Sequence, residues 1–563
     1  MESSLSTAPE ALPTAWLTGC DVVWQSRSEN AAGSMPLGNG EVGVNFWVEP
    51  NGDLLCYLAR TDAWSEHGRL LKLGRLRVSL DPNPFVGPDF QQALRLLAGE
   101  VEVTARGARL RVWVDAHAPR LHYELETEQP VALTCRLELW RTTPRVLSGE
   151  EVHSAYTMAG SPNQVVVQPD TIVDDALDRL CWYHRNQGSC WSETLQHQGF
   201  GALAEQFADP IRQRTFGGQV SGEGLTRVDA RTLASDEPRR RWHLQAVTHT
   251  SQASSAADWL AEVDSLTPAQ VDLTARREAH RAWWREFWQR SWIFVRERRG
   301  HQTQVAEVVT QGYALQRYLN ACAGRGAYPI KFNGSLFTVD GEVRSWRYDA
   351  DYRRWGDPYW FQNTRLIYWP MLAAGDFDLL QPLFRMYRAA LPLAEARTRL
   401  YFGHDGAFFP ETMTFWGCYA NHNYGWNRQG KPLSEVENRF IRWHYNSGLE
   451  LLLLLLEYQA VSSDETVIGS TILPLARAVL RFFAEHFAGS AGRLVIEPAS
   501  ALETWQDVRD PLPDVAGLRV VLDRLLAAPW TTAADRTAWA ALRVMLPALP
   551  RGEEEGRRFL RPA

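Results

Sequence analysis

The hydrophobic pattern of the chain changes its period once, near residue 267. Before that point apolar and polar residues alternate, as in R-L-R-V-S-L at 75–80 and in the runs on either side of Arg106-Gly107. The same alternation continues from Val131 to Leu139. A period of two, interrupted by turn residues, predicts antiparallel strands with one buried face. Over residues 18–264 this pattern predicts a large antiparallel β-sandwich.

Beyond residue 267 the apolar spacing becomes helical. Thr267 followed by Pro268 predicts the N-cap and first turn of a helix that runs through R-A-W-W-R-E-F-W-Q-R at 281–290. A second helix is expected from Val305 to Cys322, ended by the glycines that follow. Further helices are expected to begin near Asp376, Glu435 and Asp464.

These periods divide the chain into four expected parts. They are a flexible N-terminal tail at 1–17, the β-sandwich at 18–264, a helical linker at 265–300 and an α/α barrel at 301–563. Helices that alternate short turns with long aromatic loops suit such a barrel. Residues 301–563 have room for about eight helices. The last helices of the barrel are therefore expected to be missing.

Charge and cysteine usage narrow the class of protein. The net charge of −7 and the absence of a basic run argue against nucleic acid and anionic membranes as partners. The seven scattered cysteines include no C-x-x-C pair and are expected to be buried thiols in a reducing compartment. No H-E-x-x-H occurs, so neither a metal nor a cofactor is expected.

The N-terminus and the leucine run at 451–456 bear on localisation. The first residues lack a basic region followed by an apolar run, so no signal peptide is expected. The leucine run is too short to span a bilayer and predicts a buried helix. A cytoplasmic protein is expected, with the periplasm as the alternative.

Tryptophan is the compositional outlier, with 24 copies. Three stretches mix aromatic rings with amides, acids and arginines: 328–337, 351–371 and 408–426. Aromatic faces stack on sugar rings, and the polar groups can bind vicinal hydroxyls. One such stretch would suit an ordinary aromatic core, whereas three on successive loops favour a carbohydrate pocket.

Several motifs resemble known families. M-P-L-G-N-G-E-V-G at 35–43 looks like the opening strand pair of glycoside hydrolase family 95, and residues 317–337 resemble its first barrel helix. The runs W-Y-H-R-N, F-N-G-S-L-F, Q-N-T-R-L-I-Y-W-P and P-A-S-A-L-E-T are most similar to the bacterial domain-of-unknown-function family 5703. The resemblance covers nearly the whole chain. It implies a β-sandwich, a helical linker and an (α/α)6 six-hairpin barrel, incomplete at the C-terminus.

The resemblance also implies catalytic residues. Glu503 falls on the general acid of family 95, and Asn363 falls on an asparagine that helps to activate water. Leu502 and Trp505 beside Glu503 are expected to raise the pKa of its carboxyl by desolvation. Two departures are present, because Phe361 replaces a second asparagine and the loop at 410–416 lacks the family's histidines and aspartate. These departures argue against fucose as the substrate.

The aromatic loops supply the expected substrate-binding residues, which are Asn333, Trp360, Arg365, Glu411, Trp416 and Trp426. The carboxylate base is not identified by the resemblance, since the family's aspartate is expected beyond residue 563. The acids on the loops are Asp349, Asp351, Asp357 and Glu411, and Glu411 is the first candidate among them. His184, in W-Y-H-R-N, is expected either at the barrel mouth or in a structural role between the domains.

The expected activity is inverting hydrolysis of a glycosidic bond in a plant- or glycan-derived oligosaccharide, of fucosidase or galactosidase type. Two alternatives stay open. The chain could be a catalytically inactive carbohydrate-binding protein, or it could be a glycoside phosphorylase. The oligomeric state stays open as well.

Overall fold

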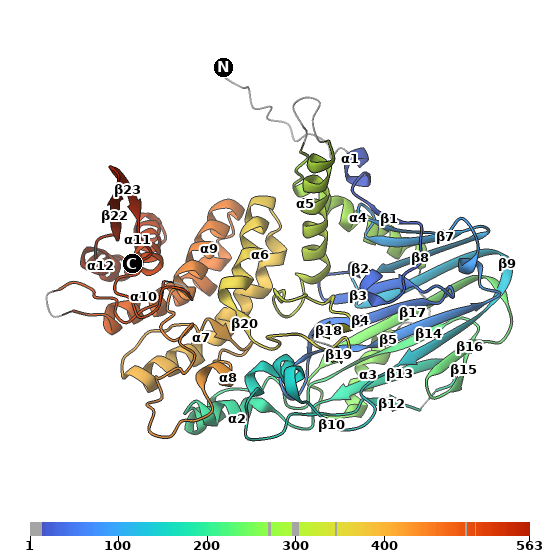
Figure 1. Cartoon of the computed structure of the whole chain (residues 1–563), viewed down its shortest axis with the longest axis horizontal. Coiled ribbons are helices and arrows are strands. Elements are labelled where there is room, and N and C mark those ends of the chain that lie inside the picture. The colour runs from blue at the N-terminus through green and yellow to red at the C-terminus, as the bar shows by residue number, and fades with distance from the viewer. Residues whose placement is uncertain are drawn as a thin grey trace, which may run out of the picture.

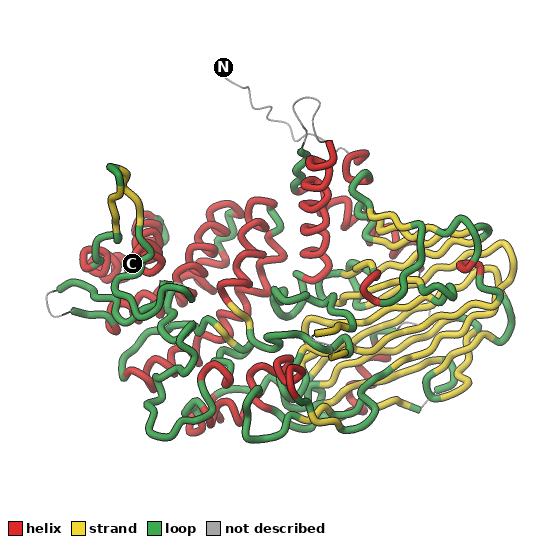
Figure 2. Tube along the Cα trace, viewed as in Figure 1, coloured by secondary structure: helices red, strands yellow, loops and turns green. Residues whose placement is uncertain are grey.

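A computed structural model of the chain describes residues 14–174, 176–267, 272–295, 303–343, 346–489, 492–501 and 503–563. Figures 1 and 2 show an N-terminal body of strands and a C-terminal body of helices. Helix α5 (Thr303–Ala323) stands between them in Figure 1. The predicted order of an antiparallel β-sandwich followed by a helical region is confirmed.

The strands form two antiparallel layers that share one long strand, β9 (Arg120–Glu138). Through its first half β9 pairs with β8 and β17, and through its second half with β5 and β16. The first layer has the order β1 (Val22–Trp24), β6 (Gln91–Arg95), β7 (Glu100–Ala105), β8 (Ala108–Val114), β9, β17 (Arg239–Ser251), β14 (Thr215–Gly222), β13 (Arg179–Arg185) and β12 (Thr171–Val173). The second layer contains β2 (Met35–Gly38), β3 (Val42–Val48), β4 (Leu54–Trp64), β5 (Leu70–Asp81), β9, β16 (Thr232–Ser235) and β15 (Leu225–Asp229).

The alternation in the sequence has the expected consequence in β5. Leu76, Val78 and Leu80 are buried, while Arg75 and Arg77 reach the carboxylate of Glu138 on β9. The apolar side chains of the two layers meet in a common core. Burial of this kind of surface is the main stabilising contribution to a sandwich.

Three short helices of the N-terminal half extend toward the C-terminal helices. They are the 3₁₀ segments η3 (Gly149–Met158) and η4 (Gly201–Gln206), and α2 (Cys190–His197), which lies beside α8 (Asn421–Tyr424) in Figure 1. The amide of Gln198 donates to the carbonyl of Tyr419 at 2.9 Å and to Oδ1 of Asn421 at 2.7 Å. The two halves of the chain are therefore joined by buried hydrogen bonds.

The C-terminal helices pack in two rows. Helices α6 (Phe361–Ala374), α9 (Ser447–Ser462) and α11 (Leu512–Ala527) contact one another in that order. Helix α10 (Leu473–His486) packs against α9 and lies between α7 (Gln381–Phe402) and α12 (Ala533–Met545), and α12 also packs against α11. The remaining helices lie in or near the N-terminal half. These helices are α1 (Thr14–Thr18), α3 (Ala256–Ser265) and α4 (Leu273–Arg290). Short strands in this half are β20 (Tyr359–Trp360) and β21 (Thr412–Met413), and the hairpins are β18 (Gly341–Val343) with β19 (Trp346–Tyr348) and β22 (Arg551–Glu554) with β23 (Arg557–Leu560).

Two predicted helix starts are wrong. Helix α4 is capped by Asp272, whose carboxylate accepts from the N–H of Ala275, and not by Thr267; Pro268 lies outside the described residues. No helix begins near Glu435, where the described chain forms turns until α9 starts at Ser447. The helices expected near Val305, Asp376 and Asp464 are present.

The leucine run at 451–456 lies inside α9 and is almost entirely buried. Across the parts of the chain that the structure describes, no helix combines the length and the apolar character needed to cross a membrane. All seven cysteines are buried, as expected.

Candidate active site

The N-terminal end of α6 is built against the segment that carries Glu411. Strand β20, directly before α6, pairs with β21, directly after Glu411. The N–H of Phe361 donates to the carbonyl of Glu411 at 2.8 Å, and the N–H of Gln362 donates to its Oε1 at 3.3 Å. The Glu411 carboxyl is therefore held at the first turn of a helix, where backbone N–H groups point outward.

Glu411 is an unusual carboxyl. Its side chain is only 1% exposed, and its Oε2 has no hydrogen-bond partner among the described residues. Burial raises the pKa of Glu411 to about 8, and the negative charge of Glu503 adds to this rise, while the Gln362 N–H and Arg365 oppose it. The acid holds its proton at neutral pH. Glu503 is therefore near enough for its charge to act on the Glu411 carboxyl.

Glu503 lies on a loop that is anchored beside the start of α9. The N–H of Ser500 donates to the carbonyl of Trp443 at 2.9 Å, and the indole N–H of Trp443 donates to Oδ1 of Asp507 at 2.6 Å. The expected apolar enclosure of Glu503 is wrong, because Glu503 is exposed and Trp505 is 49% exposed. Leu502 lies outside the described residues. Glu503 is thus open to water.

Asn363 and Arg365 lie on the first turns of α6. Asn363 is half-buried and follows Gln362 directly. Arg365 donates from Nε to Oε2 of Glu450 at 2.8 Å, and Trp369 donates to the other oxygen of Glu450 at 2.9 Å. Arg365 is therefore committed to an ion pair with α9, which ties the two helices together at this end.

Trp360 belongs to an aromatic wall formed by Tyr156, Trp360 and Trp355. Asn333 binds the backbone beside this wall. Trp360 lies 5.4 Å from Tyr156 and 6.1 Å from Trp355, measured between ring centroids. The amide of Asn333 donates to the carbonyls of Arg354 at 2.7 Å and of Trp355 at 3.0 Å. Trp355 lies in the aromatic stretch 351–371 but was not among the individually predicted binding residues, and Tyr156 was not predicted at all. Tyr156 is about 200 residues away in the chain, so only the fold could reveal it.

Trp416 and Trp426 are not part of this region, contrary to the sequence prediction. Trp416 lines a separate cavity of about 450 Å³ between α7 and the α2 region, together with Trp191, Tyr328 and Phe415. The indole N–H of Trp426 donates to the carbonyl of Ala159 at 2.8 Å, and its ring packs on His197. Both rings contribute to the contact between the domains.

The other acids proposed as the base have structural partners. Asp351 is paired with Arg141, and Asp357 accepts from the N–H of Thr157 at 2.9 Å. Asp349 is 3.6 Å from Arg145. The sequence also missed Asp514, in the first turn of α11, where burial raises the pKa of the carboxyl to about 7.

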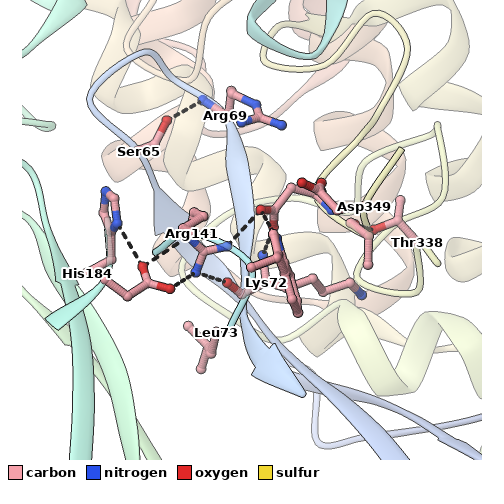
Figure 3. A network of polar contacts seen from close by, with 12 residues as sticks. Ser65, Arg69, Lys72, Leu73, Arg141, His184, Thr338 and Asp349 are labelled. Atoms are coloured by element: carbon pink, nitrogen blue, oxygen red, sulfur yellow. Dashed lines mark hydrogen bonds and ion pairs between the residues drawn. The ribbon is translucent and has the colours of Figure 1, made fainter. Parts of the chain in front are cut away.

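His184 takes part in a buried network between the domains, shown in Figure 3. Its ring nitrogens lie 3.0 Å from Asp170 and 3.0 Å from Glu66. Burial opposes protonation, but the hydrogen bonds to Asp170 and Glu66 raise the pKa of His184 to about 9. Arg141 then bridges Asp170 and Asp351, at 3.0 and 2.7 Å. Of the two roles considered for His184, the structure supports the structural one.

No group of three or more histidine, cysteine or acidic side chains suited to a metal ion occurs among the described residues. The side chains at the ends of α6 and α9 carry carboxyl, amide, guanidinium and aromatic groups. Two neighbouring carboxyls in different surroundings are the arrangement used for acid–base catalysis.

Residues 23–293 match the family described as "Domain of unknown function (DUF5703)". The resemblance to that family is thereby confirmed over those residues.

Two solved structures are similar to the whole chain. One is described as "Putative kojibiose phosphorylase from human microbiome", with a TM-score of 0.52 at 10% identity over 94% of this chain and 70% of that one. The other is a bacterial glucoamylase complexed with acarbose, with a TM-score of 0.35 at 10% identity over 93% of this chain and 69% of that one. The first likeness indicates a shared fold. No curated protein sequence matches the chain.

Proposed function

We propose that this protein cleaves glycosidic bonds of oligosaccharides at the N-terminal ends of α6 and α9, by hydrolysis with inversion. The observation that carries the proposal is the buried Glu411 carboxyl, which has an unpaired oxygen and lies within electrostatic reach of Glu503. Inverting cleavage requires one carboxyl that donates a proton and one carboxylate that activates water on the opposite face of the sugar.

The surroundings of the two glutamates favour distinct roles. Glu411 is protonated at neutral pH, as a proton donor to the leaving oxygen must be. Glu503 is open to solvent, where an attacking water can reach it, and we assign to Asn363 the orientation of that water. The family resemblance assigns the acid to Glu503 instead, so we propose that the roles are exchanged in this chain.

Charge favours hydrolysis over phosphorolysis. Glu411, Glu450 and Glu503 lie in this region, and the cation Arg365 is already paired with Glu450. A dianionic phosphate would have to bind beside these carboxyl groups while Arg365 is held by Glu450, which is unfavourable. A non-catalytic sugar-binding role is less favoured, because a buried unpaired carboxyl destabilises a protein and binding alone does not need it.

The proposal is tested with Glu411→Gln and Glu503→Gln on a panel of aryl glycosides with poor and good leaving groups. Glu411→Gln is expected to lower kcat/KM by about 10²–10⁴ on poor leaving groups and much less on good ones, since these need little protonation. Glu503→Gln is expected to lower kcat/KM on both kinds. The stereochemistry of the first product, followed by NMR, checks inversion.

The matched control is Glu465→Gln, an exposed glutamate in the turn before α10, which should leave all rates unchanged. Wild-type rates in both active-site variants would refute the site. If a good leaving group restores the kcat/KM of Glu503→Gln but not that of Glu411→Gln, Glu503 is the general acid.

A further inference from the structure

We infer that the N-terminal domain builds a sugar-binding subsite beside this site, in which η3 holds Trp355 as a stacking platform for a pyranose ring of a neutral oligosaccharide. The choice of ligand class rests on the proposed function. The arrangement of the residues does not, because it follows from contacts between η3 and the loop at 354–357.

Three aromatic rings form a continuous wall that ends at the surface. Tyr156 and Trp360 are buried, at 7% and 9% exposure, whereas Trp355 is 42% exposed. Tyr156 comes from η3 and packs on Trp360, which packs on Trp355. An exposed indole that is backed by buried rings is rigid, and a rigid aromatic face binds with little loss of conformational entropy.

Helix η3 fixes the loop that carries Trp355. The N–H of Gly356 donates to the carbonyl of His153 at 2.9 Å, and the carboxylate of Asp357 accepts from the N–H of Thr157 at 2.9 Å. The approach is so close that a Cβ atom at position 356 would lie 1.9 Å from the carbonyl oxygen of Ser154. The N-terminal domain therefore determines where the indole points.

Trp355 is held in a strained conformation. Its φ is +57°, in the left-handed region that bulky residues rarely adopt. Two hydrogen bonds from the amide of Asn333 to the carbonyls of Arg354 and Trp355 maintain this conformation. Residues strained in this way are concentrated at binding and catalytic sites.

The wall adjoins the proposed catalytic carboxyls. Trp360 pairs through β20 with Thr412, the residue after Glu411. The hydroxyl of Tyr156 donates to Oδ1 of Asn423 at 3.1 Å, and the amide of Asn423 donates to the hydroxyl of Thr412 at 3.0 Å, so Tyr156 is also linked to the residue after Glu411. A sugar ring stacked on Trp355 would thus lie at the edge of the site where the glycosidic bond is cleaved.

Polar groups that could orient a sugar accompany the rings. The exposed guanidinium of Arg354 lies 5.0 Å from the centroid of Trp355. The indole N–H of Trp360 is buried and has no hydrogen-bond partner among the described residues. Aromatic faces with N–H donors at their edges suit the C–H face and the hydroxyls of a neutral pyranose.

The decisive variant is Trp355→Gly, because glycine adopts the left-handed conformation without strain. If Trp355 serves binding, the Tm should stay the same or rise, while the affinity for the probe falls about tenfold. The probes are kojibiose, maltotriose, cellotriose and xylotriose, tested by calorimetry and tryptophan fluorescence at millimolar concentration. Phe559→Ala, at an exposed aromatic residue of β23, is the control and should change neither quantity.

A lower Tm with unchanged affinity would show that Trp355 is structural and would overturn the inference. So would a wild-type protein that binds none of the four probes. Glu411→Gln separates this inference from the proposed function, because it should remove turnover and retain the affinity. If Glu411→Gln stays active while Trp355→Gly binds poorly, the subsite stands and the catalytic assignment fails.

Discussion

The fold opposes ionisation of Glu411, so the free energy of unfolding depends on pH. Its pKa is about 8 in the folded protein, against 4.5 for a free glutamate. The folded state therefore binds the proton more tightly than the unfolded state. The resulting stabilisation is fully present below about pH 4.5 and is lost as the pH rises through about 8, at about 1.4 kcal/mol per pKa unit.

Glu411→Gln is expected to abolish this pH dependence. The Tm of the variant should approach that of the wild type at pH 5 and exceed it at pH 8, because glutamine carries no charge at either pH. Thermal unfolding across this range checks the expectation, and Glu465→Gln provides the parallel curve of an exposed glutamate. A variant whose Tm follows the wild type at a constant offset would show that Glu411 does not titrate in this range.

The sequence predicts that Glu411 lies at the site, but it does not predict the surroundings of its carboxyl. Glu411 could be proposed from its aromatic surroundings, but its burial and unpaired oxygen depend on how β21 meets the start of α6. For Glu503 the sequence suggested apolar enclosure, whereas its loop is exposed. Neighbours in sequence do not determine desolvation, because solvent is excluded by segments that are distant in the chain.

At the scale of elements, η3 and the loop at 354–357 act as a single unit. Gly356→Ala would place a Cβ against the carbonyl of Ser154, so the two segments must separate. We expect a loss of about 1–3 kcal/mol of stability, as in other overpacked sites, together with weaker binding of the oligosaccharide probes. Calorimetric binding and urea unfolding measure the two effects.

Gly341→Ala is the matched control, since no atom lies within 4 Å of a Cβ built there. It should leave both measurements unchanged. Wild-type affinity in Gly356→Ala would mean that η3 does not position the platform.

Elements with a regular period were predictable and irregular ones were not. Strand β5 and helix α5 follow from alternation and helical spacing, because each buries one face along its length. The segment at 435–446 buries Val436 and Ile441, yet it forms turns. There the Asn438 side chain accepts from the N–H of Phe440, and Arg442 donates to the Val436 carbonyl. Local side-chain bonds of this kind compete with the helix.

At the scale of the whole molecule, the network of Glu66, His184, Asp170, Arg141 and Asp351 joins the sandwich to the loop before α6. Arg141→Met is expected to destabilise the protein by about 3–5 kcal/mol, since it removes the ion-pair partner of buried Asp351 and leaves buried Asp170 with His184 alone. Urea unfolding measures this loss. Arg106→Met, which removes an ion pair with 73% and 62% exposed partners, should cost less than about 1 kcal/mol. Equal effects of the two variants would contradict the assigned role of the network.

The long strand β9 gives the sandwich a particular mechanical character. A single run of 19 residues supplies hydrogen bonds to both layers, so neither layer has a complete set of strands of its own. Separating one layer from the other would break the hydrogen bonds of β9 in one of them, so the two layers are expected to unfold together. Because η3 leaves the sandwich soon after β9 ends, the support of Trp355 is fastened close to this common strand. Trp355 is therefore supported by a part of the sandwich that is expected to resist local unfolding.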